Sequence, residues 1–142
     1  RYANVFGPRQ DATGEGGVVA IFIDRLLKGE ALKIFGDGGQ TRDFIFVRDV
    51  ASANLAALYK GDGQILNVST GTSLSVNNLF RILKEMTNSS LEPEYCLPRP
   101  GDILHSRLAN NRARKILEWS PRCTLEEGLR QTVDFHYNHS LD

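Results

Sequence analysis

Two arginines at turn positions are the residues best suited to chemistry in this sequence. Arg42 follows a glycine-rich turn at 36–39 and precedes an apolar run at 44–47. Arg99 lies in a Pro-Gly turn that also carries Asp102. A guanidinium presents its N–H donors in a rigid planar fork that matches carboxylate and phosphate groups. Two such groups together could hold a diphosphate by charge-assisted hydrogen bonds.

Other residues could complete such an anion site. Asn4 lies in the opening apolar segment, and Gly16-Gly17 precedes a helical pattern with no side chain to cover the first backbone N–H groups. Phe35, beside a strand end, could line a base pocket, and Asp102 could accept hydrogen bonds from a ribose diol. These residues taken together favour a binding site more strongly than any one of them does alone.

Each of these residues also has a structural interpretation. Arg42 could pair with Asp43 or Asp37, and Arg99 could pair with Asp102 across its own turn. The glycines before the helix could form a plain flexible loop. The residue types alone leave both interpretations open.

Catalytic machinery is missing from the sequence. It has neither a Gly-x-Gly-x-x-Gly nor a Gly-x-x-Gly-x-x-Gly motif, so it lacks a dinucleotide phosphate loop. No tyrosine has a lysine four residues later, so no Tyr-x-x-x-Lys acid–base pair exists within these residues. His136 and His139 share a helix face, but their place near the C-terminus favours surface residues over metal ligands. His105 stands alone and is expected to be structural. We predict no catalytic residue and no metal site in this chain.

The composition is that of an ordinary globular domain. The chain has 142 residues, 41% of them hydrophobic, and a formal net charge of +0. That balance argues against nucleic acid or an anionic membrane as a partner. Cys96 and Cys123 form no Cys-x-x-Cys unit, so neither a zinc site nor a redox motif is indicated. With no apolar run long enough to span a bilayer and no signal peptide at its start, we expect a cytoplasmic protein.

Periodicity predicts strands alternating with helices in one α/β unit spanning 1–142. The expected helices cover 18–28, 50–60, 75–87, 111–118 and 124–138. The expected strands cover 1–6, 32–35, 44–47, 64–68 and 91–97, with the second and third joined as a hairpin. The run at 44–47 is apolar on both faces, which predicts a strand buried on both sides.

Local signals mark several helix ends. Gly29 stands where a C′ glycine would end the first helix, and Ser75 is expected to cap the third. Asn110 is expected to cap the fourth helix, and Thr124-Leu125-Glu126-Glu127 reads as a capping box for the fifth. Asp49 is expected at the N-cap or in the first turn of the second helix.

Four motifs resemble a known family in their order and spacing. They are RYANVFGPRQ, LLKGEALKIFGDGGQTRDFIFVRDVA, RPGD and ILEWSPRCTLEEGLRQT. They are similar to the C-terminal part of extended short-chain dehydrogenase/reductases, the NAD-dependent epimerase/dehydratase family, and most of all to UDP-glucose 4-epimerases. The resemblance implies a fold: the substrate-binding portion of a Rossmann-fold enzyme, with a small mixed sheet and helices but without the N-terminal Rossmann half.

The resemblance also implies roles for the diphosphate-binding residues. Asn4 would hydrogen-bond the diphosphate of a sugar nucleotide, and Arg42 and Arg99 would grip it. The segment Gly17-Val18-Val19 at the helix start would contact the nucleotide. This agrees with the anion site inferred above for the two arginines.

Further roles follow for the nucleoside and the cofactor. By the resemblance, Lys33 and Phe35 would border the uracil, Asp102 would bind the ribose, and Val76 would pack nearby. The backbone of Tyr2 would lie near the nicotinamide of NAD. A family epimerase interconverts UDP-glucose and UDP-galactose, using NAD as a hydride store and a tyrosinate as base.

The family's NAD loop and Tyr-x-x-x-Lys pair belong upstream of Arg1. We therefore expect this segment to bind UDP-sugar but to be inactive alone. Residues 1–10 and about 42–70 are expected to pack on the missing Rossmann domain. Without it, exposed apolar surface or a bare strand edge would favour a homo-oligomer.

Three competing hypotheses remain from the sequence. The first keeps the family but changes the reaction to UDP-glucuronate decarboxylation or sugar-nucleotide dehydration, because those enzymes share the QTRD and RPGD motifs. The second is a non-catalytic sugar-nucleotide-binding module. The third, a purely structural domain, requires Arg42 and Arg99 to be satisfied internally.

Overall fold

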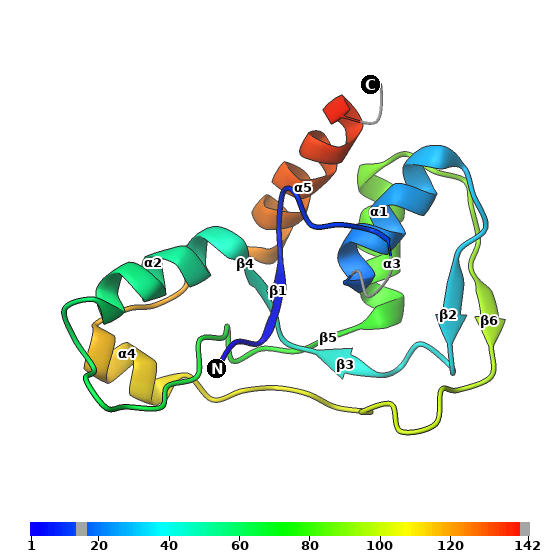
Figure 1. Cartoon of the computed structure of the whole chain (residues 1–142). Coiled ribbons are helices and arrows are strands. Elements are labelled where there is room, and N and C mark those ends of the chain that lie inside the picture. The colour runs from blue at the N-terminus through cyan, green and yellow to red at the C-terminus, as the bar shows by residue number, and fades with distance from the viewer. Residues whose placement is uncertain (14–16, 140–142) are drawn as a thin grey trace.

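The computed structural model describes residues 1–13 and 17–139, which form five helices and six strands (Figure 1). The helices are α1 (Val18–Lys28), α2 (Val47–Ala57), α3 (Val76–Met86), α4 (Asn111–Leu117) and α5 (Leu125–His139). The strands are β1 (Asn4–Phe6), β2 (Lys33–Phe35), β3 (Thr41–Arg42), β4 (Phe44–Phe46), β5 (Leu74–Ser75) and β6 (Glu94–Cys96). The predicted α/β class is confirmed.

The strands pair in three separate two-stranded ladders instead of one small mixed sheet. β1 pairs with β4 and β2 with β6, both in parallel, while β3 pairs with β5 antiparallel. The expected hairpin of β2 and β4 is therefore wrong. Each of these strands finds a partner distant in sequence, and the glycine turn at 36–39 leads into β3. Parallel pairing cannot be closed by a tight turn, so the local turn signal did not reveal it.

β4 divides two hydrophobic cores and explains the apolar run that marks it. Phe44 and Phe46 face a core that also contains α1, α3 and α5. Ile45, between them, faces a second core with residues of α2 and α4. Figure 1 shows α2 and α4 at one end of the molecule and α1 and α3 toward the other, with β1 and β4 between them. Because successive strand residues point to opposite faces, both faces of β4 are buried, as predicted.

Three helix-end signals are confirmed. Gly29 ends α1 in the left-handed conformation with φ 67°. The Ser75 hydroxyl accepts a hydrogen bond from the Asn78 backbone N–H at 3.2 Å. In the capping box, the Thr124 N–H donates to Glu127 Oε2 at 2.8 Å, and the Glu127 N–H donates to Thr124 Oγ1 at 3.2 Å. This network also lowers the pKa of the Glu127 carboxyl below its ordinary value.

Other boundaries differ from the predictions. α2 begins at Val47, three residues before the predicted start at 50, because it continues directly from β4. Asn110 makes no side-chain cap and instead donates to the Ser69 carbonyl at 2.7 Å. The predicted strand at 64–68 is reduced, among the described residues, to a single parallel bridge between Val68 and Tyr2.

Asp49 lies in the first turn of α2, as predicted, but its carboxylate serves a distant segment. It is buried and accepts hydrogen bonds from the backbone N–H groups of Arg122 at 3.0 Å and Cys123 at 3.2 Å. A carboxylate that accepts backbone N–H bonds forms a strong, directional link. Asp49 therefore joins the start of α2 to the residues that lead into α5.

Gly128 provides a stability test of the α5 contact with β1 and β4. A Cβ at this position would lie 2.9 Å from Phe6 Cζ and 3.0 Å from Phe46 Cδ2. We expect Gly128→Val to lower the free energy of unfolding by about 2–3 kcal/mol because it overpacks the core. Urea denaturation followed by circular dichroism measures this change. Arg130→Ala, on the exposed side of α5, is the matched control, and an equal loss in both variants would contradict the packing explanation.

Candidate functional site

β3 holds Arg42 at the centre of the candidate site. The guanidinium donates to Asp102 Oδ1 at 2.6 Å, to the Ile103 carbonyl at 2.5 Å and to the Thr41 carbonyl at 2.9 Å. Its side chain is only 18% exposed. The backbone of Arg42 pairs with Leu74 of β5, which fixes the direction of the strand. Arg42 therefore ties β3 to the turn that carries Asp102.

The segment after that turn runs alongside β3. The Thr41 N–H donates to the Leu104 carbonyl at 2.8 Å, and the Ser106 N–H donates to the Thr41 carbonyl at 3.0 Å. The Thr41 hydroxyl also hydrogen-bonds His105 Nδ1 at 3.1 Å. These bonds hold the segment in place independently of the Arg42 side chain, and they give His105 the structural role expected of it.

Arg99 lies against the face of an aromatic ring. Its guanidinium carbon is 3.8 Å from the centroid of the Phe35 ring, which is a cation–π contact. The expected alternative pairs are therefore wrong. Asp102 pairs with Arg42 and not with Arg99, and the partner of Arg42 is neither Asp43 nor Asp37. Arg99 and Asp102, from the same turn, thus contact different strands, β2 and β3.

Two adjoining cavities collect all ten predicted substrate-binding residues. The first, of about 210 Å³, includes Val18, Lys33, Phe35, Arg42, Val76, Arg99 and Asp102 in its lining. The second, of about 250 Å³, includes Asn4, Gly17, Val18, Val19 and Arg42. Val18 and Arg42 belong to both linings, so the two cavities meet at these residues. Six segments that are distant in the sequence thus contribute to the lining of the two cavities.

The start of α1 borders the second cavity. Gly17 is the N-cap residue and makes no side-chain cap hydrogen bond. The first N–H groups of a helix lack intrahelical partners, and the helix dipole favours an anion beside them. The contact of Gly17 with a nucleotide stays a prediction, and Gly16 lies outside the described residues.

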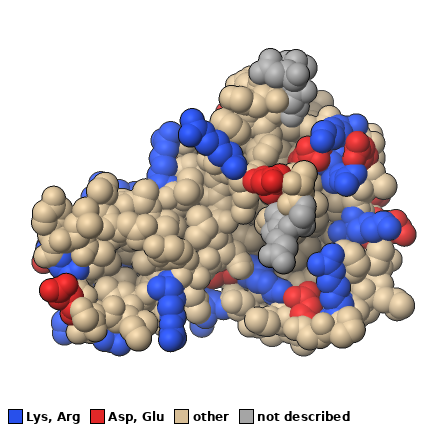
Figure 2. Space-filling view, in the orientation of Figure 1, with Lys and Arg blue, Asp and Glu red and all other residues tan. Residues whose placement is uncertain are grey.

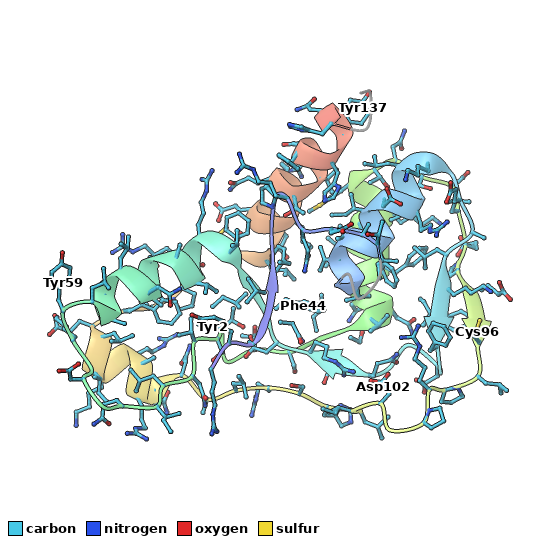
Figure 3. All side chains as sticks on the ribbon, viewed as in Figure 1. Tyr2, Phe44, Tyr59, Cys96, Asp102 and Tyr137 are labelled. Carbon is cyan, nitrogen blue, oxygen red and sulfur yellow. The ribbon has the colours of Figure 1, made fainter. Side chains whose placement is uncertain are left out.

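Tyr2 lies apart from the ten cavity residues. Its hydroxyl donates to Asn54 Oδ1 in α2 at 2.9 Å. Figure 3 shows Tyr2 and Asp102 in different parts of the molecule. The resemblance concerned the backbone of Tyr2 and a cofactor, and its role stays a prediction.

Asp43 is a residue whose importance the sequence reasoning missed. It is 1% exposed, and one carboxylate oxygen accepts from the Thr70 N–H at 3.0 Å and the Thr70 hydroxyl at 2.6 Å. The other oxygen accepts from the N–H groups of Gly71 at 3.0 Å and Leu108 at 3.4 Å. The sequence feature that could have identified Asp43 is an acidic residue directly before an apolar strand. Asp43 fixes two loops beside Arg42.

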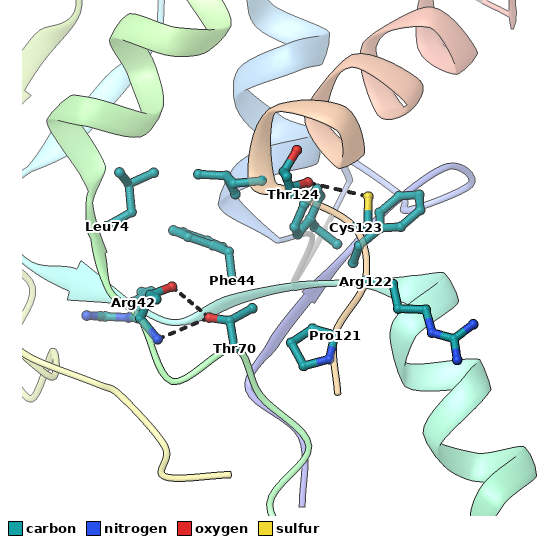
Figure 4. Close-up of a pocket in the computed structure, with 12 residues that line it drawn as sticks. Arg42, Phe44, Thr70, Leu74, Pro121, Arg122, Cys123 and Thr124 are labelled. Carbon is teal, nitrogen blue, oxygen red and sulfur yellow. Dashed lines mark hydrogen bonds between the residues drawn. The ribbon is translucent and has the colours of Figure 1, made fainter. Parts of the chain in front are cut away.

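A third cavity lies next to Phe44 and is mainly apolar. It has a volume of about 320 Å³, and its lining includes three phenylalanines, two leucines, two threonines, Arg42 and the segment before α5 (Figure 4). Its one thiol, Cys123, has a pKa raised by burial and, more weakly, by the carboxylates of Asp49 and Glu127. A raised pKa keeps the thiol neutral, so Cys123 is poorly suited to be a nucleophile.

The charge distribution fits a small, defined anion site. Figure 2 shows Lys and Arg interspersed with Asp and Glu over the visible face, without a continuous basic surface. Within residues 1–13 and 17–139, no group of three His, Cys, Asp or Glu side chains lies close enough to hold a metal ion. No helix in the described part of the chain is long and apolar enough to cross a membrane.

Comparison with known proteins finds relatives of this chain in one enzyme family. Residues 1–69 match the model of the NAD dependent epimerase/dehydratase family. The UDP-glucose 4-epimerase of Mycolicibacterium smegmatis is 49% identical over 139 residues, which is 97% of this chain and 44% of the relative. The chain thus spans less than half the length of that relative.

Solved structures agree over the whole chain. The UDP-glucose 4-epimerase of Thermotoga maritima, solved with UDP-glucose, superposes with a TM-score of 0.97 at 50% identity and covers 100% of this chain and 46% of that one. The UDP-glucose 4-epimerase of Thermus thermophilus, solved with NAD, has a TM-score of 0.87 at 39% identity and covers 99% of this chain and 46% of that one. The four motifs, the fold and these matches lead to one assignment. The chain belongs to the NAD dependent epimerase/dehydratase family.

Proposed function

We propose that this chain is the UDP-hexose-binding part of an NAD-dependent UDP-glucose 4-epimerase, which interconverts UDP-glucose and UDP-galactose in the intact protein. The observation that carries the proposal is the gathering of ten predicted residues along two cavities that meet at Val18 and Arg42. A relative with UDP-glucose bound shares the fold at 50% identity.

The diphosphate is proposed to lie where the two cavities meet. Arg42 borders both of them, and Asn4 and the uncovered start of α1 border the second. This location would surround the phosphates with a guanidinium, an amide and backbone N–H donors, all of which complement their charge. Because Arg42 is already hydrogen-bonded to Asp102, the cation would be held in position before a ligand arrives.

The nucleoside is proposed to occupy the first cavity. Lys33 and Phe35 of β2 form one side of it, with Arg99 stacked on the Phe35 ring, and Asp102 borders the same space. A wider hollow of about 550 Å³ continues past Phe35 and Arg99 along α1. An aromatic wall with an acid nearby suits a base and a ribose diol.

The described residues do not form an NAD site by themselves. The Tyr2 hydroxyl is hydrogen-bonded to Asn54, and the sequence has no glycine-rich dinucleotide loop. We therefore assign the cofactor, NAD, and the acid–base pair to other residues of the intact protein. No step of the reaction is assigned to a residue of this chain, whose role is to bind and orient the UDP-sugar.

The α2 end of the chain is proposed to pack on that nucleotide-binding half, together with residues 1–10 and the rest of 42–70. Leu55, Leu58, Tyr59 and Ile65 are between 64% and 86% exposed. Figure 2 shows few charged side chains over α2, and Figure 3 shows Tyr59 pointing into solvent. So much exposed apolar surface is unusual for a free domain. When the nucleotide-binding half is absent, the same surface would favour association with a second copy of this chain.

Ligand binding by the isolated chain tests the proposal. Titration with UDP-glucose, followed by NMR, is expected to give saturable shifts at Gly17, Phe35 and Arg42 with a Kd of ~1 mM, since only half of a site is present. Inorganic phosphate at the same concentration is the control. Shifts confined to residues outside the two cavities would overturn the proposal.

Activity tests the enzymatic part separately. With NAD, the intact protein is expected to convert UDP-glucose to UDP-galactose, and the 142-residue chain alone is expected to convert none. Turnover by the chain alone would contradict the division of roles proposed above. Release of CO₂ from UDP-glucuronate would favour the decarboxylase alternative.

A further inference from the structure

The apolar cavity beside Phe44 has no part in the function proposed above. Its volume is about 320 Å³, whereas an apolar cavity of about 150 Å³ holds a molecule of benzene. In its lining, the ring of Phe6 meets that of Phe44 edge-on, with centroids 6.5 Å apart, and lies 5.7 Å from that of Phe46. A further ring can extend such a cluster in the same geometry. The size and the lining therefore favour a ligand with one or two aromatic rings.

Buried carboxylates hold both sides of this cavity in place. Asp43 accepts hydrogen bonds from the backbone N–H groups of residues 70 and 71, both at 3.0 Å. Asp49 accepts from those of residues 122 and 123, at 3.0 Å and 3.2 Å. Both acids are buried, and they lie on either side of β4 in the sequence. The cavity is thus formed before a ligand arrives, which lowers the cost of binding.

The charged side chains of the lining are directed elsewhere. The Arg42 guanidinium donates to Asp102 Oδ1 and to two backbone carbonyls. Figure 4 shows Arg122 pointing away from the ring of Phe44. An anion that entered the cavity would lose its hydration without gaining a free cation. A neutral ligand is therefore favoured over a charged one.

The hydroxyl of Thr72 offers the cavity a hydrogen-bond acceptor. A hydroxyl has a single proton, and that of Thr70 is donated to Asp43 Oδ1 at 2.6 Å. In the 2.8 Å bond between the hydroxyls of Thr70 and Thr72, Thr72 is therefore the donor. Its own oxygen accepts no hydrogen bond from residues 1–13 and 17–139, and Thr72 is an exposed residue of the cavity lining. A ligand that carries a donor can use this oxygen.

The other hydroxyl and the thiol next to α5 are already engaged. The Thr124 hydroxyl donates to Glu127 Oε2 at 3.0 Å and accepts from the Glu127 N–H at 3.2 Å. The Cys123 thiol donates to the Thr124 carbonyl at 3.4 Å. A ligand that needs a hydrogen-bond donor from these side chains would find none.

We propose that this cavity is a second ligand site, which binds a neutral aromatic molecule of one or two rings. An N–H or O–H group of the molecule, as in an indole or a phenol, donates a hydrogen bond to Thr72 Oγ1. The site is separate from the two cavities proposed for the UDP-sugar, although Arg42 and Phe44 border both it and the second cavity.

Titration of the intact protein with indole and with benzofuran tests this site. The two molecules have the same shape, but only indole has an N–H donor. We expect saturable binding of indole, measured by NMR of methyl groups, with a Kd of ~1 mM. Thr72→Val keeps the side-chain shape but removes the acceptor, so it is expected to weaken indole binding about fivefold and to leave benzofuran binding unchanged. Thr13→Val replaces an exposed threonine outside the cavity and is the matched control.

Several results would overturn the proposal. Thr72→Val could weaken both molecules equally or neither of them, and then its oxygen is not the acceptor. Tighter binding of benzoate than of indole would contradict a neutral ligand, and displacement of indole by UDP-glucose would place indole in the nucleotide cavities. Binding by the 142-residue chain but not by the intact protein would mean that a side chain of the missing half fills the cavity.

The parent protein decides the matter if Thr72→Val does not fold. Nuclear Overhauser effects are expected between the indole ring and the methyl groups of Leu74 and Leu125, which line the cavity. Effects confined to other methyl groups would overturn the proposal. None of these measurements depends on the binding of UDP-glucose, so failure of the proposed function would be recognised separately.

Discussion

Replacing Arg42 with alanine is expected to weaken binding of UDP-glucose about 100-fold. A charge-assisted hydrogen bond contributes about 1.5–3 kcal/mol, and Arg42 is placed to make more than one such bond to the diphosphate. The substitution should weaken ligand binding more than it lowers the stability of the fold. Thr41 still hydrogen-bonds Leu104 and Ser106 through its backbone, so the neighbouring segment keeps its anchor.

Calorimetric titration with UDP-glucose in the intact protein measures the effect. Arg130→Ala is the matched control, because Arg130 is exposed on α5 and borders neither cavity. Arg42→Lys keeps the charge but loses the planar fork. Its affinity for UDP-glucose is expected to lie between that of the parent and that of Arg42→Ala. If Arg42→Ala binds within twofold of the parent, the purely structural interpretation of Arg42 is the better one.

The second large effect is on stability. Asp43→Ala is expected to lower the free energy of unfolding by about 3 kcal/mol, because it removes a buried carboxylate that accepts four hydrogen bonds. The N–H groups of Thr70, Gly71 and Leu108 would lose their acceptor, and both loops would be released. Asp43→Asn keeps the shape but turns one oxygen into a donor, so it is expected to cost nearly as much.

Urea denaturation followed by circular dichroism tests this expectation. Asp62→Ala, in an exposed turn, is the control and should leave the midpoint unchanged. A shift for Asp43→Ala no larger than that of the control would mean that the loops hold their positions without the carboxylate. Loosening of the 70–72 loop should also reach the binding site, since β5 follows it and pairs with Arg42.

The neighbouring residues Arg42 and Asp43 have different roles within one short segment. Arg42 points toward the cavities and the turn at Asp102, while Asp43 points inward to the loops at 70 and 108. The alternation of side chains along an extended backbone separates them. A binding cation beside a buried anchoring acid gives the site a rigid support, which keeps the cost of ordering Arg42 on binding small.

Features that depend on nearby residues could be predicted from the sequence. The end of α1 at Gly29, the Ser75 cap and the capping box before α5 are each decided within four residues. The ten residues predicted to bind substrate were identified from their motifs, and the structure brings them together from segments far apart in the chain. The burial of 44–46 on both faces followed from its composition.

Features that depend on distant partners could not be predicted in this way. The partners of β2 and β4 are decided by which strands lie beside them after folding, and a local turn signal carries no information on that. Asn110 resembled a helix cap, but the Ser69 carbonyl, 41 residues away, competes for its amide. The pairing of Arg42 with Asp102 and the stacking of Arg99 on Phe35 likewise follow from how two turns approach each other.

The sequence by itself therefore determined the family resemblance, the helix ends and the residue types of an anion site. Only the tertiary structure decided which acid holds Arg42 and which carboxylate anchors the loops behind it. Motif spacing records which residues are present, whereas hydrogen bonds over 60 positions of sequence exist only once the chain has packed.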